Sequence, residues 1–160
     1  EFIRSTPLLI QVYFLFYVFP NYGLNLSAMQ AGIIGIALHY ACYTAEVYRA
    51  GLDAVPRSQW EAVTALNMKP WTAYRDVILP QAMRIVIPPH ASNCVSIIKD
   101  TSLASVVAMT DLLKQATDAQ ALFANPSPLI GAAIIYVAIL WPLVRLTGWL
   151  ETRFQRAYRR

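Results

Sequence analysis

The chain has 160 residues, of which 57% are hydrophobic and 14% are charged, and its net charge is +4. About a quarter of the residues of an ordinary soluble domain are charged, and the mean hydropathy here is +0.42. The composition therefore excludes an ordinary soluble domain and favours a membrane-embedded protein. The basic residues lie between or after apolar runs, which is typical of a cytoplasmic membrane face and not of a nucleic-acid-binding surface. The two cysteines lack the paired spacing of a disulfide framework or a metal site.

The first uncharged stretch of the chain predicts two membrane spans separated by a Pro- and Gly-containing turn. The first span, residues 6–19, would be about 21 Å long as a helix, which is less than the roughly 30 Å of a bilayer. We therefore expect this span to be partial, with its beginning upstream of Glu1. The second span, residues 24–45, is long enough to cross, and Gly32 and Gly35 favour close packing of this helix.

The next segment, residues 49–84, contains charged residues and three prolines and is too polar to lie in lipid. A connection of this length is expected to have structure of its own. Two further apolar segments, residues 85–110 and 126–146, predict two more spans. The predicted fold class is all-α: a polytopic helical membrane protein with about four transmembrane helices in a single domain, residues 1–160.

The counts of Lys and Arg predict the orientation of these spans. Five lie in the loop 49–84 and four in the C-terminal tail, whereas only Lys114 lies between the last two spans. The loop and the C-terminus are therefore expected to be cytoplasmic. The outer connection, residues 111–123, has apolar residues at helical spacing and predicts a short interfacial helix with Thr110 as its N-cap. Pro142 is expected to kink the last span.

The loop contains the segment GLDAVPRSQWEAVTALNMKPWTAYRDVILPQAMR, which resembles the EAA loop of binding-protein-dependent ABC importer permeases. The family pattern is Glu-Ala-Ala, then Gly, then Ile-x-Leu-Pro; here Asn67 stands in the glycine position and Val77 in the isoleucine position. The flanking segments are similar to the polar amino acid permeases of type I importers: RSTPLLIQ, TAEVYRAGLDAVPRSQWEA, LPQAMRIVIPP and IKDTSLAS. The resemblance covers nearly the whole chain and implies a piece of a five-helix permease subunit.

The resemblance also implies a function and partners. The chain is expected to be the permease subunit of an ATP-driven importer that translocates polar amino acids, or a similar zwitterion of the ectoine or hydroxyectoine kind, across the bacterial cytoplasmic (inner) membrane. The implied partners are an ATP-binding cassette subunit, a second permease subunit as homo- or heterodimer, an extracytoplasmic solute-binding protein and membrane lipid. No lysine follows a glycine as a phosphate-binding loop requires, so ATP and Mg²⁺ are expected on the partner subunit. No catalytic residue, metal or cofactor is expected in this chain.

Within the loop, residues 56–66 predict a short amphipathic helix in which Trp60, Val63 and Asn67 share one face. Such a short helix needs a partner surface, which by resemblance is a groove of the ATP-binding subunit. Asn67 is expected to keep the left-handed helix end of the family's glycine, and Pro70 to begin a second short helix. The residues expected to couple ATP hydrolysis to transport are Trp60, Glu61, Ala62, Val63, Asn67, Leu79 and Pro80.

Charged side chains inside a span are functional candidates because burying them is costly. Lys99 and Asp100 lie within the third predicted span, and Asp100 shares a polar stripe with Ser96. We expect Asp100 to receive the cationic group of the substrate. The resemblance places the RSTP and IKDTSL segments at the substrate pocket. The expected substrate-binding residues are Thr6, Ile10, Gly35, His39, Asp100 and Ser102.

Several alternatives stay open on the sequence alone. Lys99 and Asp100 could form a purely structural ion pair, and His39 a purely structural interhelical hydrogen bond. A stand-alone secondary carrier would use Asp100 as its ion or proton site, but it predicts inverted repeats, and none is visible in the sequence. A small structural membrane protein would leave the intramembrane charges and the EAA-like loop without a role.

Overall fold

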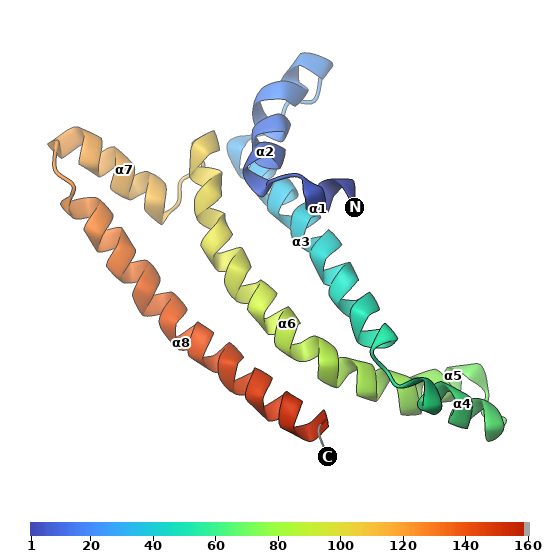
Figure 1. The fold of residues 1–160 in the computed structure, drawn as a ribbon. Helices are drawn as coiled ribbons and strands as arrows, with labels where there is room; N and C mark the ends of the chain where they lie inside the picture. The colour runs from blue at the N-terminus through green and yellow to red at the C-terminus, as the bar shows by residue number, and fades with distance from the viewer. Residues whose placement is uncertain (159–160) are drawn as a thin grey trace. The chain divides into compact units, whose positions relative to one another are not determined.

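The computed structural model of the chain is all-helical (Figure 1). It describes residues 1–158, with the side chains of the last helix described through Phe154. Of the basic tail predicted to be cytoplasmic, Arg159 and Arg160 lie outside the described residues. In chain order the α-helices are α1 (Phe2–Ser5), α2 (Leu8–Tyr13), α3 (Ala28–Asp53), α4 (Arg57–Ala65), α5 (Pro70–Ala73), α6 (Leu79–Asp100), α7 (Leu112–Phe123) and α8 (Ser127–Tyr158).

Four short segments of other helix types join these α-helices. The π-helix η1 and the 3-10 helix η2 follow α2 directly, the π-helix η3 leads into α6, and the 3-10 helix η4 continues from the end of α6. Their bounds are η1 (Phe14–Val18), η2 (Phe19–Tyr22), η3 (Tyr74–Ile78) and η4 (Thr101–Val107).

The chain divides into two compact units. The first unit consists of residues 1–42 and 94–144, and the second of residues 43–93 together with α8 from Arg145 onwards. The helices α3, α6 and α8 each contribute residues to both units.

The first unit is held by close contact of α2, α3 and η4. Its buried cluster contains Leu8 and Val12 of α2, Tyr40 of α3 and Val107 of η4. A Cβ on Gly35 would lie 2.8 Å from Cγ2 of Val12 on α2. A Cβ on Gly32 would lie 2.9 Å from Sδ of Met109, just after η4. The predicted role of Gly32 and Gly35 in close helix packing is therefore confirmed.

The second unit contains a helical hairpin, α4 and α5 with η3. Pro56 precedes α4 as its N-cap residue, and Asn67 has a φ of 48° just after the helix. The N–H of Met68 donates to Val63 O, and the N–H of Asn67 donates to Thr64 O, which together form a Schellman motif. The left-handed conformation predicted for Asn67, the short helix after Pro56 and the second helix starting at Pro70 are confirmed.

The long helices extend beyond the predicted spans. The span predicted at 24–45 is α3, which continues to Asp53, and α6 begins at Leu79, before the predicted 85. The loop predicted at 49–84 is therefore mostly helical, because its charged residues are compatible with a helix and do not end one. The helical span predicted to 110 changes to a 3-10 helix at Thr101, and α8 runs beyond 146 to Tyr158.

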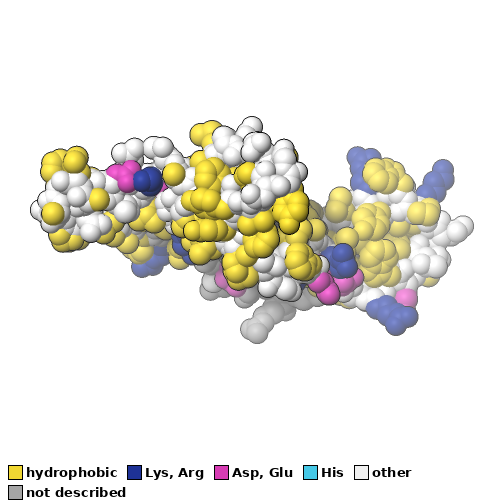
Figure 2. Space-filling model, turned by 90° about the horizontal axis from the view of Figure 1, so that it is seen from above, with side chains coloured by type: hydrophobic (Ala, Val, Ile, Leu, Met, Phe, Trp, Pro, Cys, Tyr) yellow, Lys and Arg dark blue, Asp and Glu magenta, His cyan; other side chains and the backbone are white. Residues whose placement is uncertain are grey.

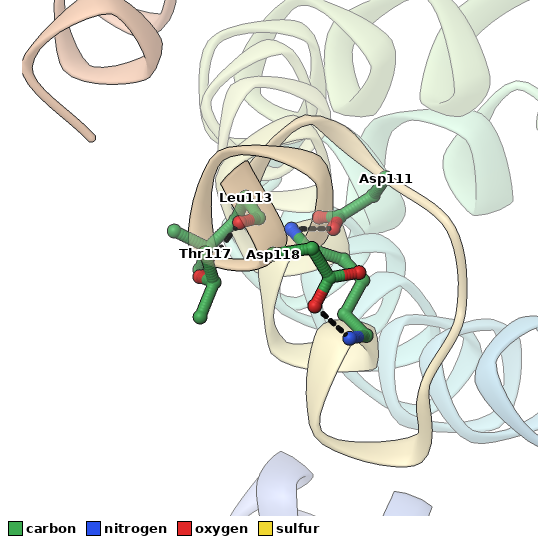
Figure 3. A network of polar contacts seen from close by, with 5 residues as sticks. Asp111, Leu113, Thr117 and Asp118 are labelled. Carbon is green, nitrogen blue, oxygen red and sulfur yellow. Dashed lines mark hydrogen bonds and ion pairs between the residues drawn. The ribbon is translucent and has the colours of Figure 1, made fainter. Parts of the chain in front are cut away.

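The predicted N-cap of the outer helix is wrong by one residue. Asp111, not Thr110, caps α7: its Oδ1 accepts a hydrogen bond from the N–H of Lys114 at 2.7 Å (Figure 3). A carboxylate also interacts favourably with the helix dipole at this end. The side chains of Lys114 and Asp118 form an ion pair one turn further along α7.

Among the described residues, one helix, Ser127–Phe154, is long and apolar enough to cross a membrane, and Leu8–Tyr22 is a shorter apolar helix. Hydrophobic side chains cover much of the face seen in Figure 2. On α8, large apolar residues spaced three or four apart are exposed: Ile130, Ile134, Val137 and Trp141. An exposed stripe of this kind is compatible with a lipid environment.

Candidate functional site

The break between α1 and α2 exposes backbone carbonyl groups. Pro7 has no N–H, so Ile3 O loses the helical donor that this position would otherwise supply. The side chain of Gln11, one turn into α2, replaces it: its Nε2 donates to Ile3 O at 2.7 Å and to Thr6 O at 2.8 Å. Gln11 therefore fixes the RSTP segment to α2.

The same amide group reaches His39 on α3, with 3.1 Å between Gln11 Nε2 and His39 Nδ1. The two carbonyl contacts require the nitrogen, not the oxygen, of the amide at this position, because two carbonyl oxygens would repel a third oxygen. The two N–H groups of this amide are already donated to Ile3 O and Thr6 O, so the contact with His39 does not fix which ring nitrogen of a neutral His39 carries the proton. The amide oxygen of Gln11 is buried and has no hydrogen-bond partner within residues 1–158.

Asp100, the last residue of α6, contacts the residue next to His39. The hydroxyl of Tyr40 donates to Asp100 Oδ2 at 2.6 Å, which is the length of a charge-assisted hydrogen bond. Tyr40 is only 8% exposed and belongs to the buried cluster of the first unit. The rings of His39 and Tyr40 are in edge contact, with centroids 5.5 Å apart. Gln11, His39, Tyr40 and Asp100 thus form a continuous polar group, which we call the Asp100 cluster.

The other predicted substrate-binding residues have different surroundings. Thr6 Oγ1 donates to Phe2 O, and Ser102 Oγ donates to Lys99 O, so both hydroxyls are bonded to nearby backbone. Gly35 is buried against α2. Ile10 is 45% exposed. The structure brings Thr6, through its carbonyl group, and His39 together on Gln11, and it shows no direct contact of Ser102 or Ile10 with Asp100.

Two members of the Asp100 cluster were not anticipated from the sequence. Gln11 lies in an apolar run, and a lone amide in such a run is the feature that could have pointed to it. The sequence around Tyr40 contains no comparable feature, because aromatic residues are frequent in membrane helices. The neighbouring His39 is the more obvious polar candidate.

The helical hairpin of α4 and α5 buries part of its predicted contact face within the chain. Val63 is buried, α4 packs against η3, and the ring of Trp60 lies in edge contact with that of Tyr74, with centroids 5.9 Å apart. The side chains of Gln59 and Gln81 also form a hydrogen bond. The predicted residues Glu61, Ala62, Asn67, Leu79 and Pro80 are exposed.

Two further apolar side chains of the hairpin are strongly exposed. Leu66 is 74% and Trp71 75% exposed, and neither was singled out from the sequence. Each is a large apolar side chain in or beside the EAA-like segment whose burial against a protein partner would be favourable.

The whole chain, residues 1–160, matches the family described as binding-protein-dependent transport system inner membrane component. The chain belongs to this family. It is 35% identical over 162 residues to the probable amino-acid ABC transporter permease protein PatM of Vibrio harveyi, covering 99% of this chain and 73% of PatM. It is 36% identical over 156 residues to the L-cystine transport system permease protein TcyB of Bacillus subtilis, covering 96% of this chain and 67% of TcyB.

A solved structure is also similar. The crystal structure of an amino acid ABC transporter with histidines has a TM-score of 0.88 and 33% identity, covering 96% of this chain and 72% of that chain. The chain spans only part of the length of the curated relatives that it matches, for example 74% of the probable glutamine permease GlnM of Bacillus subtilis and 38% of BztC of Rhodobacter capsulatus.

These similarities agree with the ABC permease fold and with the function inferred from the EAA-like loop. The chain is a permease subunit of an amino-acid ABC importer of the inner membrane. Permeases of this family have no ATP site of their own and no bound cofactor, and dependence on a binding protein implies both an ATPase and a solute-binding protein as partners. The stand-alone secondary carrier is therefore set aside.

Proposed function

We propose that this permease translocates a polar amino acid or a chemically similar zwitterion, with solutes of the ectoine kind included, through a site built around the Asp100 cluster. The observation that carries this proposal is the bond between Tyr40 and Asp100. It holds a carboxylate in a largely apolar unit while the other carboxylate oxygen has no hydrogen-bond partner in the described part of the chain. A zwitterion carries the ammonium group that such an oxygen accepts.

The same cluster offers groups for the rest of a zwitterion. A neutral His39 has one ring N–H, which is a hydrogen-bond donor suited to a substrate carboxylate, and the buried oxygen of Gln11 is an additional acceptor. Thr6, Ile10, Gly35 and Ser102 keep their proposed place around the substrate on the family resemblance, with Ser102 next to Asp100 in the chain.

The proposed topology places residues 1–160 in one transmembrane domain of about four spans from a five-helix subunit. The hairpin of α4 and α5 and the C-terminus are cytoplasmic, and α7 is external, as the distribution of Lys and Arg predicts. The subunit pairs with a second permease subunit, identical or related. Exposed hairpin residues, among them Glu61 and Ala62, contact the ATPase and transmit its movements.

The test is reconstitution of the permease with its ATPase, a second permease subunit and its solute-binding protein in liposomes. ATP hydrolysis and uptake are measured for each of the amino acids and for ectoine. Stimulation of both by at least one of these zwitterions is expected. Failure of the permease to assemble with an ATPase, or stimulation only by sugars or metal ions, would contradict the proposal.

A further inference from the structure

The bond between Tyr40 and Asp100 also limits what the carboxylate can accept. Asp100 is in the intermediate class of exposure, and its Oδ2 receives the Tyr40 hydroxyl at 2.6 Å. A guanidinium group binds a carboxylate through two parallel N–H···O bonds, one to each oxygen, so it must share Oδ2 with the Tyr40 hydroxyl that already donates there. A single ammonium group needs only one oxygen, because it behaves as a compact charge with three rotatable donors.

The hydroxyl of Tyr40 is not free to move away from Asp100 without disturbing the core. The Tyr40 ring is 8% exposed and packs with Leu8, Val12 and Val107, and its edge contacts His39. Packing in the core already fixes the rotamer of the Tyr40 side chain. The hydrogen bond to Oδ2 therefore costs little additional side-chain entropy. The remaining oxygen, Oδ1, has no hydrogen-bond partner among residues 1–158 and is the acceptor that Asp100 can offer to a ligand.

We propose that Tyr40 is a specificity-determining residue that restricts Asp100 to a single ammonium group, such as the α-ammonium group of an amino acid, and excludes a guanidinium group from this position. The inference rests on the proposed function, because it requires Asp100 to contact the substrate. It adds a substrate class to that site: a zwitterion whose positive charge at Asp100 is an ammonium group.

The test compares two small cations as competitors in the reconstituted transporter. Substrate-stimulated ATP hydrolysis is measured with increasing methylammonium or methylguanidinium, in the wild type and in Tyr40→Phe. Phenylalanine keeps the ring in the core and removes only the hydroxyl. The wild type is expected to be inhibited by methylammonium at lower concentration than by methylguanidinium. In Tyr40→Phe the ratio of the two inhibition constants is expected to shift by about tenfold towards methylguanidinium, the size of one added charge-assisted hydrogen bond.

Two further variants separate this role from a structural one. Tyr17→Phe removes another tyrosine hydroxyl of the same unit, which donates to Val106 O at 3.3 Å, and the ratio should not change. In an Asp100→Asn background both cations should inhibit much more weakly, and Tyr40→Phe should not strengthen inhibition by methylguanidinium, because the hydroxyl acts through the carboxylate. The solute-binding protein is the same in every sample, so a change in the ratio arises in the permease.

The outcomes distinguish this inference from the function on which it rests. If no zwitterion stimulates the wild type, the proposed function fails. If a zwitterion does stimulate it but neither cation competes, or the ratio in Tyr40→Phe stays within about twofold of the wild type, the specificity role of Tyr40 is wrong while the permease function stands. An equal shift in Tyr17→Phe would also contradict it.

Discussion

Asp100 carries the only charge of the Asp100 cluster if His39 is neutral. Its neighbour in sequence, Lys99, is exposed, and the described contacts of Asp100 are to Tyr40 and not to this lysine. The purely structural ion pair that the sequence left open therefore does not form in this structure. A partly buried carboxylate needs compensation by donors, by water or by a cation, and the Tyr40 hydroxyl supplies one such donor. The remaining requirement is what a cationic substrate group would meet.

Replacing Asp100 by Asn tests this charge. The amide oxygen of Asn can still accept the Tyr40 hydroxyl, so the local packing is expected to survive, whereas the attraction for an ammonium group is lost. We expect transport to weaken by about 1.5 to 3 kcal/mol, the scale of a hydrogen bond to a charged group. The measurement is uptake at several substrate concentrations. The matched control is Asp118→Asn, which neutralises an exposed carboxylate on α7. Normal transport by the Asp100→Asn variant would show that the substrate site is assigned wrongly.

Three helical segments end in a left-handed residue that is not glycine: Asn67 after α4, Ala108 after η4 and Ala124 after α7. In each case the next residue donates its N–H back into the helix. Asn tolerates this conformation because its short polar side chain interacts locally with the backbone, whereas Ala has no such compensation. The helix ends at Ala108 and Ala124 are therefore more strained than the helix end at Asn67.

How much of the fold can be predicted from the sequence depends on whether the residue at a helix boundary marks that boundary by its own chemistry. Pro56, Asn67 and Pro70 are residues whose own chemistry marks a helix boundary, and the hairpin that they delimit was predicted correctly. No proline precedes the end of α3 at Asp53, and the helix continues through Gly51, so the sequence-based prediction ends this span too early, where charged residues begin. Likewise nothing in the side chain of Ala108 announces a turn. The Asp100 cluster was predicted in part, because Tyr40 and Gln11 become significant only when α2, α3 and α6 come together.

Replacing Ala124 by Gly should relieve the strain at the end of α7. An alanine in the left-handed conformation costs roughly 1 to 2 kcal/mol, and glycine removes this strain from the folded state. Glycine also gives the unfolded chain more conformational entropy, which offsets about half of the benefit. The net stabilisation should therefore be about 0.5 to 1 kcal/mol. Ala121→Gly is the control: Ala121 is exposed within α7, and the same change there should destabilise by a similar amount. The measurement is the thermal unfolding midpoint of the two purified variants. Equal shifts of the same sign would contradict the argument.

The EAA-like segment and the proposed substrate site both contribute residues to α6. The Leu79 and Pro80 pair of the EAA-like segment opens α6, and Asp100 closes it. Pro88 and Pro89 lie inside it and remove two of its backbone donors, so bending is easiest in this region. A displacement of the hairpin therefore has a direct covalent path to the residue that we propose to hold the substrate.

Ala62→Arg tests whether α4 transmits such a displacement. Ala62 is exposed on α4, so an arginine there should leave the helices inserted and folded while obstructing close approach of the ATPase. We expect uptake to fall at least about tenfold, which corresponds to about 1.4 kcal/mol of coupling free energy. ATP hydrolysis by the assembled complex should continue, with or without its dependence on substrate. Uptake and ATP hydrolysis are measured in the same liposomes. Ala121→Arg, an exposed alanine on the helix proposed to lie outside, should keep the two activities linked. Undiminished uptake in Ala62→Arg would remove α4 from the coupling path.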